Sequence, residues 1–146
     1  MKRYLPGLHF EAQKDEPIPG GLFLVQVRRV SHHWNRQKPF FRVHFTILEP
    51  KQFADRDLEG RVYSTEKALW KLSWFLRAFG YDQELLSRDE VDEKALIGLR
   101  GVVQVGQVQM NGRSYLNLDA FASAGEWDEL SLAATSVGQK EAGDGL

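Results

Sequence analysis

One stretch decides the fold: Gly101-Val102-Val103-Gln104-Val105-Gly106-Gln107-Val108-Gln109-Met110-Asn111-Gly112-Arg113-Ser114-Tyr115-Leu116-Asn117-Leu118-Asp119. In it, Asn111-Gly112 separates two runs of alternating residues. A type I′ turn needs a positive φ at both central residues, and Asn-Gly adopts these angles at little cost. The stretch therefore predicts an antiparallel β-hairpin.

Three further β-like runs precede this hairpin. The first strand is expected over residues 21–30, where Phe23, Val25 and Val27 share one face. The second is expected over residues 40–48 and has a regular inward row of Phe41, Val43, Phe45 and Ile47. Residues 51–59 form a charged connector, and a short third strand begins at residues 60–63.

An apolar helix is expected between the third strand and the hairpin, over residues 66–79. Ser64 or Thr65 is placed to cap its start, and Gly80 to end it. Its predicted buried stripe is Leu69, Leu72, Phe75, Leu76 and Phe79, widened by Trp70 and Trp74. The capping-box spacing of Ser87-Arg88-Asp89-Glu90 predicts a second short helix, which continues to residues 95–97 and ends at Gly98.

The order of these elements is β-β-β-α-β-β. This order indicates an all-β fold with an inserted helix, a five-stranded Greek-key barrel of the oligonucleotide- and oligosaccharide-binding (OB) type, plus the second short helix before the fourth strand. Residues 1–20 read as an irregular N-terminal arm, residues 21–122 as the OB domain, and residues 123–146 as a C-terminal tail that is largely disordered.

Composition narrows the class of protein. The chain has 146 residues, no cysteine and a net charge of −1. The sequence shows no signal-peptide pattern and no run near the roughly 20 apolar residues that cross a bilayer, so we expect a cytoplasmic protein without membrane contact. Residues 1–80 carry 14 Lys and Arg against 8 Asp and Glu, whereas residues 81–146 carry 5 against 12. Either the basic residues gather on one surface that binds a charged partner, or the two halves of the chain interleave in space and their charges mix.

The chain has few candidates for catalysis. It has no phosphate loop, dinucleotide fingerprint or nucleophile elbow, and a hydrolase that pairs His44 with Glu49 has no supporting spacing. His32 and His33 are adjacent and point apart in an extended chain, so with His44 they make a poor metal site. We predict no enzyme, no catalytic or metal-binding residue and no cofactor.

Basic and aromatic residues interleave in the loop expected over residues 31–39 and on the strands beside it. Single-stranded nucleic acid needs cations along its phosphates and flat rings for its bases. Arg113 and Tyr115 on the last strand are weaker candidates. The predicted binding residues are Arg28, Trp34, Arg36, Lys38, Phe40, Arg42, Arg61 and Tyr63.

Several segments resemble a family of small phage-type and bacterial proteins that are taken to be single-stranded-DNA-binding-like. They are residues 20–25, 39–49, 60–63, 65–68, 76–80 and 99–103, within a region of about residues 18–120. The resemblance implies a five-stranded OB barrel and binding of single-stranded DNA. The chain departs from it in its near-neutral charge and in a tail without an acidic tip, Glu141-Ala142-Gly143-Asp144-Gly145-Leu146.

We therefore predict a non-enzymatic, sequence-tolerant binder of single-stranded nucleic acid, with DNA favoured over RNA as the partner. In this hypothesis Trp34, Phe40 and Tyr63 stack bases, and the arginines and Lys38 follow the phosphates. The alternative is a protein-interaction or assembly module on the same barrel. Trp70, Trp74 or an uncovered strand edge would then form a homo-oligomer or a groove for a partner.

Overall fold

The structure, a computed structural model, describes residues 2–6, 8 and 18–134. Its strands are β1 (Gly21–Asn35), β2 (Lys38–Glu49), β3 (Asp57–Tyr63), β4 (Arg100–Met110) and β5 (Arg113–Ser123). Its α-helices are α2 (Leu69–Ala78), α3 (Gln83–Ser87) and α4 (Glu93–Leu96). Three 3-10 turns are η1 (Lys51–Phe53), η2 (Glu66–Ala68) and η3 (Ala124–Glu126), and residues 127–134 are helical.

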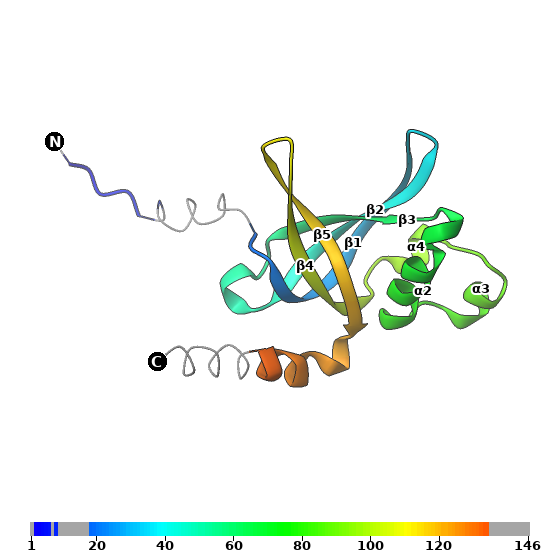
Figure 1. The fold of residues 1–146 in the computed structure, drawn as a ribbon. Coiled ribbons are helices and arrows are strands. Elements are labelled where there is room, and N and C mark those ends of the chain that lie inside the picture. Colours follow the sequence, from blue (N-terminus) through cyan, green and yellow to red (C-terminus); the bar gives the residue numbers. More distant parts are fainter. Residues whose placement is uncertain (1, 7, 9–17, 135–146) are drawn as a thin grey trace, which may run out of the picture.

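The strands form one antiparallel sheet in the order β3-β2-β1-β4-β5, with short helices at one end (Figure 1). The five strands of the predicted Greek-key barrel are present, but the barrel is not closed, because no hydrogen-bonded ladder joins β3 to β5 among the described residues. Side chains join these edges instead. A Cβ built on Gly60 of β3 would lie 2.5 Å from the Leu118 side chain of β5. The sheet therefore curls until its edges touch without pairing.

The predicted β4–β5 hairpin is confirmed. Val108 pairs with Tyr115 and Met110 with Arg113 across the turn. Asn111 and Gly112 have φ angles of 53° and 75°, the positive values that a type I′ turn requires. Pairing shifts register between Gln104 and Val105, an irregularity that bends the hairpin.

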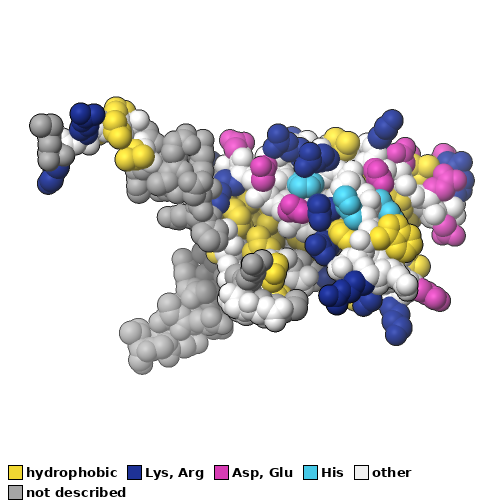
Figure 2. All heavy atoms as spheres, turned by 90° about the horizontal axis from the view of Figure 1, so that it is seen from above, with side chains coloured by type: hydrophobic (Ala, Val, Ile, Leu, Met, Phe, Trp, Pro, Cys, Tyr) yellow, Lys and Arg dark blue, Asp and Glu magenta, His cyan; other side chains and the backbone are white. Residues whose placement is uncertain are grey.

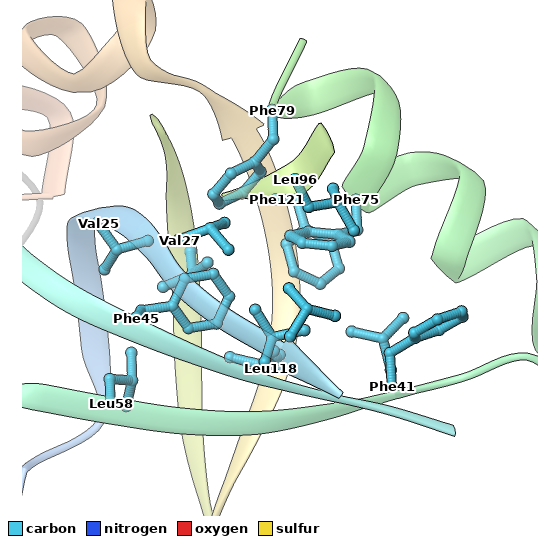
Figure 3. Close-up of a cluster of buried hydrophobic side chains, with 14 of the residues drawn as sticks. Val25, Val27, Phe41, Phe45, Leu58, Phe75, Phe79, Leu96, Leu118 and Phe121 are labelled. Atoms are coloured by element: carbon cyan, nitrogen blue, oxygen red, sulfur yellow. The ribbon is translucent and has the colours of Figure 1, made fainter. Parts of the chain in front are cut away.

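The core lies between the concave face of the sheet and helix α2. The inward row predicted on β2 is confirmed, since all four of its side chains are buried. Phe75 of α2 and Phe79, the residue that caps its C-terminus, pack against Phe45 of β2 and Phe121 of β5. The ring centroids lie 4.7–6.4 Å apart within the group (Figure 3). Aromatic burial of this kind supplies much of the apolar area that holds a small domain together.

The prediction of a loop over residues 31–39 is wrong. Residues 31–35 continue β1, residues 38–39 begin β2, and the turn is only Arg36-Gln37, with φ angles of 50° and 68°. These angles make the same kind of tight turn as Asn-Gly, but Arg and Gln give no sequence signal for it. The third strand likewise begins at Asp57 rather than Gly60.

The helical region differs from prediction in three ways. Leu69 and Trp70 are exposed rather than buried, so the buried residues of α2 are Leu72, Phe75 and Leu76. Thr65 occupies the N-cap position of η2 without a side-chain hydrogen bond. The second short helix is two helices, α3 and α4, whose N-caps are Asp82 and Asp92. Ser87 therefore ends a helix instead of beginning one.

Only parts of the two predicted end segments are described. Ile18, near the end of the arm, is buried in the core, and its carbonyl accepts a hydrogen bond of 3.3 Å from Gln107 Nε2. Residues 1, 7 and 9–17 lie outside the described residues. Of the predicted tail, residues 124–134 are helical and residues 135–146 lie outside the described residues.

Candidate functional site

Two adjoining hollows meet at Tyr63, at the end of β3. One has a volume of about 900 Å³ and lies between the β1–β2 turn and η2. The other, of about 940 Å³, runs from the same turn along β3 to α2 and to Tyr115 of β5. Asn35, Arg36, Tyr63 and Ala68 line both. We call the two hollows together the Tyr63 groove.

Cations outnumber carboxylates in the Tyr63 groove. Among the described residues, its charged lining is Arg36, Lys38, Arg61, Lys67 and Lys71 against Glu59 and Glu66. Every one of these cations comes from residues 1–80, whereas β5 contributes the uncharged Tyr115, Leu116 and Asn117. Lys and Arg side chains also gather on the side toward which both hairpin tips project, with acidic and His side chains among them (Figures 1 and 2). The basic half of the sequence thus contributes the charge of this groove.

The charges around Tyr63 act on its phenol. Partial burial raises the pKa of Tyr63, but hydrogen bonds from Arg61 and Asn35 and the positive charges of Arg61 and Lys38 outweigh burial. The net result is a pKa below the usual value for tyrosine. The two cations therefore favour the phenolate form of Tyr63.

Phe40 lies beneath the groove rather than on its surface. It is only 2% exposed. His33 stacks on its ring with centroids 5.6 Å apart, Tyr63 lies against it at 5.4 Å, and the Arg61 guanidinium lies 4.6 Å from its centroid. Its predicted role as a base-stacking ring does not fit this burial. Phe40 instead supports Tyr63 and Arg61 from below.

Arg42 and Glu59 neutralise each other on the same outer face. Arg42 Nε lies 2.9 Å from Glu59 Oε1, although the buried N–H is not directed at a hydrogen-bond acceptor. His44 Nδ1 lies 3.8 Å from Glu59 Oε2, and Arg29 approaches the other ring nitrogen of His44 at 3.4 Å. Glu59 is thereby held by its neighbours, which limits the repulsion that it would exert on an anion in the groove.

Arg28 and Trp34, two further predicted residues, lie outside the groove. Arg28 falls at a register shift in β1 and pairs with Asp57 at 3.0 Å, and it lines neither hollow. Trp34 is 68% exposed on the β1–β2 hairpin and packs edge-on against His32. Because Asn35 and Arg36 follow it into the groove, Trp34 flanks the groove on the hairpin side.

The structure thus brings Arg36, Lys38, Arg61 and Tyr63 together, and adds three groove residues from outside the predicted set. Lys67 and Lys71 come from η2 and α2, and Tyr115, treated above as a weaker candidate, comes from β5. The signal for the two lysines was their spacing of four residues at the start of a helix, which places them on one face. Nothing in the sequence indicated that this face would meet β3.

His32, His33 and His44 do not form a metal site. Among the described residues, no group of three or more His, Cys, Asp or Glu side chains is placed to hold a metal ion. His33 instead contacts Ser31 Oγ at 2.7 Å, and His32 contacts Ser64 Oγ at 3.5 Å.

No protein-family model matches the chain, and a search of curated proteins found no similar sequence. Within the described residues, the longest helices are too short or too polar to cross a membrane.

Proposed function

We propose that this protein is a non-enzymatic, sequence-tolerant binder of single-stranded nucleic acid, DNA in preference to RNA, and that the strand lies in the Tyr63 groove. One observation carries the proposal: five cations and two tyrosine rings line two adjoining hollows that share Tyr63 and contain only two carboxylates among their described residues. Cations neutralise phosphates, and flat rings stack on bases of any sequence. A net charge of −1 for the whole chain does not oppose this, because the groove itself is positive.

The fold that we propose is an OB-type barrel left partly open between β3 and β5. The strand order β3-β2-β1-β4-β5 and the contact of Leu118 with Gly60 support this assignment. In such barrels the 1–2 and 4–5 loops flank the ligand. Here the β1–β2 turn supplies Arg36 and β5 supplies Tyr115 to the same hollow.

Each part of the groove has a proposed role. Arg36, Lys38 and Arg61 contact phosphates near Tyr63, whose ring stacks on a base. Lys67 and Lys71 contact phosphates along α2. Phe40 and Arg42 hold the surface in shape rather than contacting the strand, since the first is buried and the second is paired with Glu59.

Fluorescence anisotropy with a labelled oligo-dT tests the proposal. We expect binding at low salt, with an affinity that falls as salt rises by a log–log slope of about 0.7 for each neutralised phosphate. The double variant Lys67→Ala/Lys71→Ala should bind more weakly and with a shallower slope. Lys51→Ala removes an exposed lysine of η1 that lines neither hollow, and it should bind like the parent protein.

Two results would overturn the proposal. One is no binding at low salt with roughly 50 µM protein, a concentration at which even non-specific binding is detected. The other is an equal loss of affinity in the Lys51 control and in the groove variant, since charge would then act without a defined site.

A further inference from the structure

Two tryptophans on α2 form a stacked pair that the groove does not include. The Trp70 and Trp74 rings lie 6.3 Å apart at an interplanar angle of 24°. Trp74 is half-buried and packs edge-on against Phe121 of β5 at 5.6 Å. Trp70 is 64% exposed. The inner ring is therefore fixed against the core, and the outer ring is presented to solvent.

This pair adjoins the lysines of the groove. Lys67 precedes Trp70 by three residues, and Lys71 precedes Trp74 by three residues. Side chains at this spacing are neighbours on a helical surface. These lysines line the two hollows. A strand that leaves the groove beside them therefore comes to the edge of α2 that carries the Trp70 ring.

The chemistry of the pair favours a nucleobase over other apolar ligands. A large ring left in water costs free energy that stacking recovers, and indole is a strong partner for the π-face of any base. The lysines beside it complement the phosphates that accompany a base. A protein partner docked on Trp70 would have to place an acidic surface over the same lysines.

We infer that Trp70, backed by Trp74, is a second base-stacking site, and that it extends the path of the strand beyond the Tyr63 groove onto α2. This inference rests on the proposed function. It adds that the binding site is longer than the groove and that its outer part recognises bases rather than charge alone.

Binding of oligo-dT of increasing length, from about 4 to about 16 nucleotides, tests the inference, because OB domains occupy sites in this range. Trp70→Ala should leave the affinity for the shortest strand unchanged and weaken the affinity for the longest about tenfold. Trp70→Phe should retain most of the affinity. The matched control is Leu69→Ala, which removes an exposed apolar side chain from the preceding position, 49% exposed, and should have no effect.

An abasic strand of the same length separates stacking from charge. It carries phosphates without bases, so Trp70→Ala and the parent protein should bind it equally. If Trp70→Ala binds the longest oligo-dT as tightly as the parent protein does, this inference is overturned and the proposed function stands. No binding by the parent protein at any length would overturn both.

Light scattering, run beside the binding measurements, tests the alternative that Trp70 and Trp74 form an assembly contact. The parent protein would then be an oligomer and Trp70→Ala a monomer, and both would bind every strand with equal affinity. The two tryptophans would in that case form a contact between copies of the chain. That result would contradict the stacking site.

Discussion

At the scale of single residues, Tyr63 shows how position sets chemistry. Its ring rests on Phe40, and its hydroxyl lies among the positive charges of Arg61 and Lys38. Nothing in the sequence around this tyrosine indicates an unusual pKa. Its pKa is lowered because the β1–β2 hairpin and β3 bring Arg61, Lys38 and the hydrogen bond from Asn35 to it.

The first prediction concerns this pKa. Arg61→Ala removes a hydrogen bond to the phenol and one nearby positive charge, so the pKa of Tyr63 should rise. Bound oligo-dT should also raise it, because phosphates disfavour the phenolate. The measurement is an ultraviolet titration of the phenolate with Tyr63→Phe as the reference, so that the other tyrosines cancel. A pKa that is equal in Arg61→Ala and the parent protein would contradict the charge arrangement.

The second prediction concerns packing at Gly101. A Cβ at this position of β4 would lie 2.5 Å from the ring of Phe79, which is buried in the core. Gly101→Ala should therefore lower the free energy of unfolding by about 1–3 kcal/mol, as overpacking does in other cores. Urea denaturation measures it. Gly125→Ala, where nothing lies within 4 Å, is the matched control and should change stability little.

At the scale of elements, the β1–β2 hairpin decides the shape of the groove. Its register shifts between Val27 and Arg29, so the alternation of faces changes there and Val30 is buried along with Val27. Bulges of this kind bend and twist a strand. The bend carries the end of β1 past β4, where Asn35 and Arg36 enter the groove.

The third prediction tests the turn of this hairpin. Gln37 has a φ of 68°, which costs a non-glycine residue about 1–2 kcal/mol. Gln37→Gly removes that cost but adds backbone entropy to the unfolded chain, so the protein should gain about 0.5–1 kcal/mol of stability. Urea denaturation measures the gain. Gln52→Gly, at an exposed position of η1, should bring no gain; a gain of the same size there would show that strain at Gln37 is not the cause.

Elements also divide into those that the sequence predicts well and those that it does not. The β4–β5 hairpin was predicted because Asn-Gly strongly favours a type I′ turn. Strand β2 was predicted because strict alternation of apolar and polar residues fits a half-buried strand. The Arg36-Gln37 turn was missed because neither residue favours a positive φ. Leu69 and Trp70 were misplaced because helical spacing identifies a face but not how far along the helix the sheet extends.

At the scale of the whole molecule, the curl of the sheet brings distant segments to one site. Tyr115 of β5 and Arg61 of β3 line the same hollow, although β3 and β5 are opposite edges of the sheet. Leu118 packed on Gly60 holds those edges together. The groove therefore exists only in the folded, curled sheet.

The fourth prediction follows from that arrangement. Tyr115→Ala should weaken binding of oligo-dT about tenfold, within the ~1–3 kcal/mol expected for one stacked base, and Tyr115→Phe should not. Anisotropy at low salt measures both. Tyr4→Ala removes an exposed tyrosine that lines neither hollow and should bind normally. If Tyr115→Ala binds as tightly as the parent protein, β5 is not a wall of the binding site.

The sequence by itself determined the order of the elements, the hairpin at Asn111-Gly112, the inward row of β2 and the supply of cations in residues 1–80, because each depends on local conformational preference or on composition. Only the tertiary structure decided that Phe40 is covered, that Arg28 is paired with Asp57, and that Lys67, Lys71 and Tyr115 join Tyr63. These outcomes depend on how far β1 bends and how closely β3 and β5 approach. Both are set by packing between segments far apart in the chain, which local patterns do not encode.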